Sequence, residues 1–249
     1  MPKHSLALQY HENTKAVPEL QPYDTKMQYK IYPNAEAIPL EKNNTTMIGQ
    51  DNKSFLHVLM SRKSIRAFTS DNINLETLSK LLTLSCGLNN DTENSIKRTY
   101  ASAGGRYPIE VYVAIFRSDD MEKGLYHFNV INNTLELIKR GDYSKEIYDF
   151  YENQKSAITT DYPCLIMFSM VFKRSMEKYG ERGYRFALLD AGHMSQNLYL
   201  VATYLNLGIV AIGAGMESDD KLDDMLGLVH NEENVFYSFA TGIPYSKDI

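Results

Sequence analysis

The sequence predicts an α+β fold, and three observations indicate it. Several short runs rich in β-branched and aromatic residues are typical of strands. A few longer stretches carry apolar residues at helical spacing, and one of them is apolar on nearly every side. No repeat or low-complexity linker divides the chain, so we expect strands and helices to share one core. A chain of 249 residues buries roughly 70–75% of the surface that its unfolded form exposes, which is enough for a large core without disulfides.

Residues 1–50 are polar and interrupted by prolines, with tyrosines spaced between the prolines. This composition predicts an extended N-terminal arm. Because a disordered tail is usually poor in aromatic residues, we expect the arm to pack on the core or on a partner subunit. Residues 51–249 form the predicted domain.

Two helices are expected next. The first begins at Ser54 and stops at a polar cluster over residues 61–64. The second begins at Asn74, a residue type that caps helix N-termini, and ends at Gly87. Both have an apolar stripe along one side, so each is predicted to pack against the core.

The predicted strands span residues 109–116, 125–130, 135–138, 164–172, 209–213 and 235–240. Asn132 and Asn133 tolerate a positive φ and therefore predict a hairpin turn between the second and third strands. The run at 164–172 is almost wholly apolar, which predicts a central strand.

The longest helix is expected over residues 182–205, ended by Gly208. Its second half is apolar on nearly every side, which predicts a helix buried all round. By the same reasoning His193 and Gln196 are expected to be interior polar groups with hydrogen-bond partners.

The composition excludes several functions. Lys and Arg number 26 against 31 Asp and Glu, a net charge of -5, whereas nucleic-acid binders usually carry a basic excess. Neither Cys86 nor Cys164 belongs to a C-x-x-C pair, and the histidines show no metal-binding spacing, so we expect no metal. No signal peptide and no apolar window of membrane-spanning length is found, which predicts a cytoplasmic protein with no membrane association.

Three short segments carry groups suited to chemistry. Residues 61–66 gather cations and hydroxyls after a helix, as a phosphate site requires, although a solvated basic turn is the alternative. Residues 102–105 let backbone amides approach a flat ligand, although a tight turn explains them equally well. Lys178 and Tyr179 place an ammonium beside a phenol, two groups that burial can tune for proton transfer; an exposed helix start is the alternative.

Four stretches occur together in an order that is found in a known family. They are residues 61–68 (SRKSIRAF), 102–112 (SAGGRYPIEVY), 178–185 (KYGERGYR) and 192–198 (GHMSQNL), followed by Gly208 and residues 211–213. In this the chain resembles, over about residues 54–244, the FMN-dependent nitroreductase superfamily. The second and third stretches resemble its SagB-type branch, the peptide thiazoline and oxazoline (azoline) dehydrogenases.

The resemblance implies a homodimer with a central, mainly antiparallel sheet, long flanking helices and FMN at the subunit interface, and it makes residues 51–249 an FMN domain. It places the FMN phosphate on Arg62, Lys63, Ser64 and Arg66. It places Ser102, Ala103 and Gly104 against the flavin ring from the partner subunit, and Gly213, Ala214 and Gly215 near N5. The small pair Ala191 and Gly192 would allow close packing between subunits.

The implied reaction is the oxidation of a peptide thiazoline or oxazoline to an azole, with Lys178 or Tyr179 taking or relaying the proton. A cyclodehydratase complex and a peptide substrate are the implied partners. Two alternatives remain. One is a small-molecule flavin oxidoreductase, either a nitroreductase using NAD(P)H or a dipeptide-desaturating oxidase. The other is a flavin-bound assembly subunit without turnover, which would have no need of the lysine–tyrosine pair.

The chain departs from the family pattern at three places. Ala101 stands where the branch usually has proline, and Arg106 stands where an aliphatic residue is common. Arg106 is therefore a candidate substrate contact that would place a cation near the flavin or the substrate mouth. A late basic residue that contacts the phosphate in many nitroreductases corresponds at best to Lys247.

Overall fold

The computed structural model describes residues 5–15, 29–41, 53–89, 97–151, 161–212 and 216–246. Within these ranges one seven-stranded sheet has the order β1-β4-β3-β2-β5-β7-β6, and all neighbouring strands are antiparallel. The strands are β1 (Glu36–Pro39), β2 (Ile109–Ile115), β3 (Gly124–Asn129), β4 (Thr134–Arg140), β5 (Cys164–Val171), β6 (Gly208–Ile212) and β7 (Glu233–Gly242). The antiparallel sheet and the α+β class are therefore confirmed.

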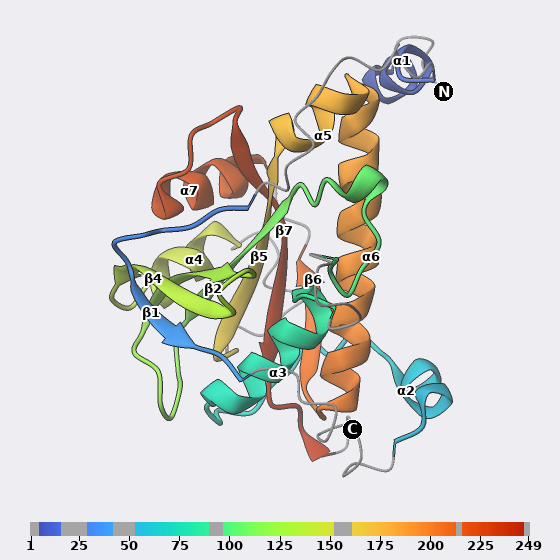
Figure 1. Ribbon diagram of the computed structural model, residues 1–249. Coiled ribbons are helices and arrows are strands. Elements are labelled where there is room, and N and C mark those ends of the chain that lie inside the picture. Colours follow the sequence, from blue (N-terminus) through green and yellow to red (C-terminus); the bar gives the residue numbers. More distant parts are fainter. Residues whose placement is uncertain are drawn as a thin grey trace.

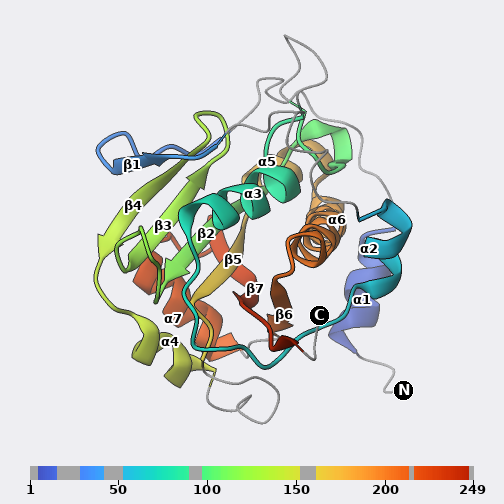
Figure 2. The same ribbon diagram turned by 90° about the horizontal axis from the view of Figure 1, so that it is seen from below.

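Helices cover both faces of the sheet (Figures 1 and 2). They are α1 (Leu6–Asn13), α2 (Phe55–Ser61), α3 (Leu75–Cys86), α4 (Ser144–Phe150), α5 (Phe172–Tyr179), α6 (Arg182–Tyr204) and α7 (Met216–Leu226). The helices α3 and α6 lie on one face, and α4 and α7 lie on the other (Figure 2). Successive β2 side chains alternate between the two faces, so Val111 joins the core under α6 while Tyr112 joins the core under α7.

Asn74 caps its helix as the sequence predicts, and Ser54 caps the preceding helix in the same way. The Ser54 side chain accepts a hydrogen bond from His57 N, and the Asn74 side chain accepts one from Thr77 N. Asn133 has a φ of 53°, as the hairpin turn between β3 and β4 requires. The apolar strand β5 lies inside the sheet between β2 and β7, which confirms its central position.

The N-terminal arm contains more regular structure than an extended segment. The helix α1 lies against the N-terminal end of α6, where Arg182 donates hydrogen bonds to the carbonyls of Thr14 and Lys15 (Figure 1). The strand β1 extends the sheet at the free edge of β4. The prolines of the arm did not exclude β1, because an edge strand tolerates a proline such as Pro39.

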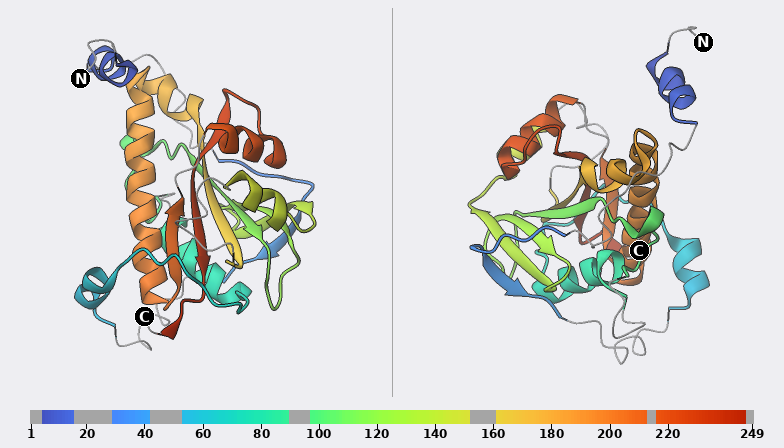
Figure 3. Two further views of the ribbon diagram at one scale, coloured as in Figure 1. Left: turned by 180° about the vertical axis from the view of Figure 1, so that it is seen from behind. Right: turned by 45° about the horizontal axis from the view of Figure 1, so that its top comes forward.

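The prediction that α6 is buried all round is wrong. One side of α6 packs on α3 and the sheet, but Leu188 and Leu189 are exposed, and so are His193 and Gln196. These positions recur at helical spacing, so they form one open face. Figure 2 looks along α6 and shows that α1 and α2 both lie on the side of α6 that faces away from the sheet. Figure 3 shows them at opposite ends of α6.

Among the helices in the described ranges, none has the length and apolar character needed to cross a bilayer.

Candidate functional site

The basic cluster at residues 62–66 lies beside the C-terminal half of α6. It follows α2 directly, and the Ile65 amide donates to the Ile209 carbonyl, which holds the segment along the edge strand β6. The Arg62 guanidinium lies 5.5 Å from the ring centroid of Tyr199 on α6. Lys63 and Arg66 are exposed at the surface. Positive charge is thus gathered where α2, α6 and β6 meet.

The Tyr199 hydroxyl joins this cluster to β6. Ser64 donates to the Tyr199 oxygen over 3.3 Å, and the Ala211 amide donates to the same oxygen over 2.8 Å. Ala211 lies two residues before the segment expected to face the flavin near N5. That segment, Gly213, Ala214 and Gly215, falls outside the described residues, and so does Lys247.

The glycine-rich turn forms a second group of site residues at the N-terminal half of α6. Asp190 on α6 is buried and accepts hydrogen bonds from the Ser102 hydroxyl and from the Ala103 amide. The Ser102 oxygen in turn accepts from the Tyr107 amide over 2.8 Å. Burial raises the pKa of Asp190, although the two hydrogen bonds act to lower it. Asp190 therefore fixes the turn on α6.

Lys178 and Tyr179 lie at the C-terminal end of α5 and not at the start of the long helix. Gly180, with a φ of 54°, ends α5, and α6 begins two residues later. Gly104 in the 3-10 turn η2 (Ala103–Gly105) has a φ of 61°, and a Cβ built on it would overlap the Tyr179 hydroxyl and Lys178 Nζ. The structure thus brings the turn and the lysine–tyrosine pair of one chain into contact, and the positive φ at this position favours a glycine.

The structure buries Arg106, the residue that the sequence makes a candidate substrate contact. It is 5% exposed. Its Nε donates to the Arg174 carbonyl over 2.6 Å, and its Nη2 lies 3.3 Å from Glu177 Oε2. A buried guanidinium needs such acceptors, and both belong to α5. Arg106 therefore connects the glycine-rich turn to α5.

The two groups of site residues lie apart along α6. Asp190 and Tyr199 are about 14 Å apart along the helix axis, at about 1.5 Å of rise per residue. Ser102, Gly104, Lys178 and Tyr179 gather near Asp190, whereas Arg62 and Ser64 contact Tyr199. One chain therefore holds both groups without bringing them together.

Sequence reasoning missed Asp190, Arg174 and Tyr199. Asp190 and Tyr199 sit in an apolar helix and belong to no motif of catalytic groups. One available signal was Asp190 itself, because a carboxylate on the buried side of a helix requires donors from another segment. Arg106 gave a similar signal, because a cation in an otherwise apolar motif calls for a carboxylate elsewhere.

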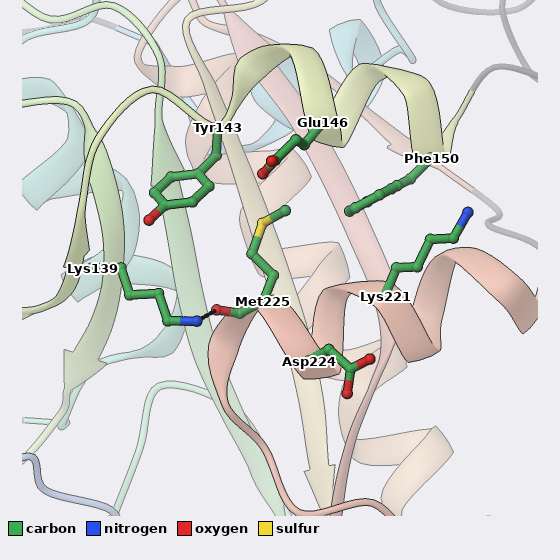
Figure 4. A pocket seen from close by; sticks show the side chains of 7 residues that line it. All are labelled: Lys139, Tyr143, Glu146, Phe150, Lys221, Asp224 and Met225. Atoms are coloured by element: carbon green, nitrogen blue, oxygen red, sulfur yellow. Dashed lines mark hydrogen bonds between the residues drawn. The ribbon is translucent and has the colours of Figure 1, made fainter.

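Two other features lie away from these groups. A groove of about 420 Å³ runs between α4 and α7, lined by Lys139, Tyr143, Glu146, Phe150, Lys221, Asp224 and Met225 (Figure 4). None of the predicted site residues within the described ranges lines it. Asp220, Asp223 and His230 bring ligand atoms within 4.8 Å of one another, but both Asp223 oxygens already accept hydrogen bonds, from Val235 N and Asn234 Nδ2.

Comparison with known proteins gives both sequence and structural matches. The family model described as "Nitroreductase family" matches residues 59–243. A Methanocaldococcus jannaschii protein that bears a nitroreductase name is 30% identical over 162 residues, which span 65% of this chain and 79% of that protein. The microcin B17-processing protein McbC of Escherichia coli is 27% identical over 139 residues, which span 54% of this chain and 50% of McbC.

A structural match covers nearly the whole chain. It is a chain in the E. coli microcin synthetase McbBCD complex with truncated pro-MccB17 bound. The TM-score is 0.64 and the identity 21%, and the match covers 97% of this chain and 83% of that chain. The two chains therefore share a fold.

Proposed function

The chain belongs to the nitroreductase family, and we propose that it is an FMN-dependent dehydrogenase that oxidises thiazoline or oxazoline rings of a ribosomally made peptide to azoles. The observation that carries this proposal is the contact of Lys178 and Tyr179 with the glycine-rich turn at Gly104. The sequence similarity to McbC, a protein named for microcin processing, supports it.

FMN, the cofactor of this family, supplies the acceptor for the hydride when it is bound. The residues of the chain fit its phosphate: Arg62, Lys63, Ser64 and Arg66 offer the charged and hydroxyl donors that a phosphate takes. Gly104, which lacks a Cβ, lets Lys178 and Tyr179 approach the turn that is proposed to meet the ring. In the proposed site Ser102, Ala103 and Gly104 approach the ring, and Gly213, Ala214 and Gly215 lie near N5.

We place the complete site between two copies of the chain. The exposed face of α6 continues onto exposed apolar residues of α2, of which Met60 is 84% exposed. A Cβ on Gly192 would meet nothing within 4 Å, so the chain's own packing does not require this glycine. Ala191, in contrast, is buried in the core. Of the small pair, Gly192 is therefore the residue that is available for close contact with a second copy.

Two-fold symmetry explains how the separated groups meet. A two-fold axis perpendicular to α6 would lay the α6 helices of two copies side by side in opposite directions. The basic cluster of one copy would then face the glycine-rich turn and the Lys178–Tyr179 pair of the other.

Leu189→Asp is expected to yield a monomer that no longer retains FMN, because it buries a carboxylate in the proposed interface. The matched control is Val229→Asp, since Leu189 is 59% and Val229 60% exposed but Val229 follows α7 at the other side of the sheet. Light scattering after size exclusion measures the mass, and absorbance near the flavin band measures retention. A Leu189→Asp dimer that stays yellow would exclude this face.

The chain supplies the proton acceptor in the proposed reaction. Aromatising an azoline ring removes two hydrogens, one as a hydride and one as a proton. Lys178 Nζ and the Tyr179 hydroxyl lie together over Gly104, so one can take the proton while the other relays it. The Tyr179 ring packs edge-on against Phe186 at 4.8 Å between centroids, which orients the phenol.

Mass spectrometry of an azoline peptide tests the function. With FMN and an electron acceptor present, each thiazoline or oxazoline ring is expected to lose about two mass units. A protein that remains colourless after incubation with FMN would refute the cofactor site. Reduction of the flavin by NAD(P)H without azole formation would instead indicate a small-molecule oxidoreductase.

The proposed partners follow from the substrate. A peptide must already contain an azoline ring, so a cyclodehydratase must act before this enzyme. We propose that the chain works within such a complex. The similarity to McbC, together with the fold match to a chain of the McbBCD complex, supports this proposal.

A further inference from the structure

The helix α5 carries Lys178 and Tyr179 and is held by both apolar and polar contacts. Phe172, Met176 and Tyr179 recur at helical spacing, and Phe172 packs on the core under α6 and stacks on Tyr184. The buried residues of α5 are nevertheless polar, Arg174 and Ser175. Because a buried guanidinium requires acceptors, the contacts of Arg174 also fix the position of α5.

Two arginines connect α5 to the glycine-rich turn, and each donates to the backbone of the segment that carries the other. Arg106, from the glycine-rich turn, donates to the backbone of α5 at the Arg174 carbonyl, 2.6 Å away. Arg174, from α5, donates to the backbone of the turn segment at the Tyr107 carbonyl, 3.1 Å away. Each arginine also reaches a carboxylate: Glu177 lies 3.3 Å from Arg106, and Glu110 lies 2.5 Å from Arg174.

The carboxylate of Glu110 is fixed in the sheet. It lies on β2 and is 2% exposed. Burial alone would raise the pKa of Glu110, but the Arg174 guanidinium and His127 outweigh burial and hold the pKa at about 2. The carboxylate is thus ionised at neutral pH and pairs with Arg174. Because β2 continues directly from the glycine-rich turn, both acceptors of Arg174, the Tyr107 carbonyl and the Glu110 carboxylate, lie in one continuous segment of the chain.

The residues of α5 that the two arginines hold lie close to Lys178 along the helix. Arg174 and Lys178 are four residues apart, so they lie on the same side of the helix. Glu177, held by Arg106, directly precedes Lys178. Near the middle of α5, the Ser175 hydroxyl donates to the Gly183 carbonyl over 2.9 Å and connects α5 to the first turn of α6.

We infer that Arg106 and Arg174 form a reciprocal clamp that positions Lys178 and Tyr179 against the glycine-rich turn. The inference rests on the proposed function only for the chemical role of Lys178 and Tyr179, and not for their position. Arg106 is thus a positioning residue, which gives a use to the cation that stands where relatives commonly have an aliphatic side chain.

Arg106→Leu tests the clamp, with Glu177→Gln as a milder variant. In hydrogen exchange we expect the amides of residues 172–179 to lose protection by about tenfold or more, since local opening reports local contacts. We expect kcat for azole formation to fall about 10- to 100-fold, because a misplacement of about 1 Å has that effect, with KM little changed. The visible spectrum of bound FMN should be unaltered.

Arg117→Leu is the matched control. Arg117 also pairs with a carboxylate, Asp161, and donates to a backbone carbonyl, that of Thr69, but has no contact with α5 among the described residues. Its loss should leave the protection of α5 and kcat unchanged.

The outcomes separate the clamp from the function. Unchanged protection of α5 in both Arg106→Leu and Glu177→Gln would overturn the clamp. Loosened α5 with unchanged kcat would overturn its positioning role. If the wild-type protein forms no azole, the proposed function fails, and hydrogen exchange still decides whether the arginines hold α5.

Discussion

Lys178→Ala and Tyr179→Phe are each expected to lose azole formation while the purified protein stays yellow with bound FMN. A positioned acid or base contributes about 10²- to 10⁴-fold in rate, and we expect kcat to fall within this range. Both groups lie against Gly104, on the opposite half of α6 from the basic cluster. Their loss should therefore affect proton transfer without weakening the hold on the phosphate.

The controls are neighbouring residues of the same types. Lys173→Ala removes an exposed lysine from the same helix α5. Tyr184→Phe removes a hydroxyl from a ring that stacks on Phe172 and meets Tyr10 edge-on. Both controls should retain turnover.

Single-turnover kinetics with an azoline peptide makes the measurement, and absorbance gives the flavin content of each variant. Because Tyr179→Phe keeps the ring and its contact with Phe186, a loss in this variant reports the hydroxyl alone. Undiminished azole formation in both variants would contradict the role of the pair, and loss of flavin from either would show that these residues bind the cofactor.

The local signals in the sequence predicted most of the fold. Asn74 and Gly87 marked the ends of α3, because capping depends on residues next to the helix. The β-branched and aromatic content of β2 likewise acts within the strand. The short helices α4 and α7 were not predicted. The helix α5 was missed because it has only eight residues and follows β5 directly, and its polar contacts come from a distant turn.

The motifs of the site were visible in the sequence, but their partners were not. Lys178, Tyr179 and Gly104 were all singled out, and the structure brings them together. The link between Ser102 and Asp190 joins residues far apart in the chain, and no local pattern encodes it. The burial of Arg106 and its pairing with Glu177 could not be predicted for the same reason, because both depend on a segment far away in the sequence.

The open face of α6 could not be predicted from the sequence for a different reason. Leu188 and Leu189 are apolar and therefore indicate burial, but the pattern does not say whether the chain itself or a second copy covers them. Gly192 has the same ambiguity: among the described residues a Cβ on it would meet nothing within 4 Å, so the chain's own packing does not explain the glycine.

Arg66→Ala and Arg62→Ala are each expected to weaken FMN binding strongly. A hydrogen bond to a charged group is worth about 1.5–3 kcal/mol, so the Kd for FMN should rise about 10- to 150-fold in each variant. Arg66 is exposed and donates to the Ser64 carbonyl over 3.5 Å, a long hydrogen bond, so its loss should act mainly through charge. Arg62 also packs on the Tyr199 ring, and we expect the larger effect there.

Riboflavin separates the phosphate contact from every other cause, because it carries the same ring without the phosphate. If Arg66 binds the phosphate, Arg66→Ala should change the Kd for FMN and leave that for riboflavin as it was. The salt dependence of FMN binding should also become shallower, since one charge pair is lost. Arg140→Ala, which removes a half-exposed arginine paired with Glu36 and Glu122 on the far edge of the sheet, should change neither ligand. An equal loss for FMN and riboflavin would mean that Arg66 acts on the ring or on the fold, and the basic cluster would then lose its assignment to the phosphate.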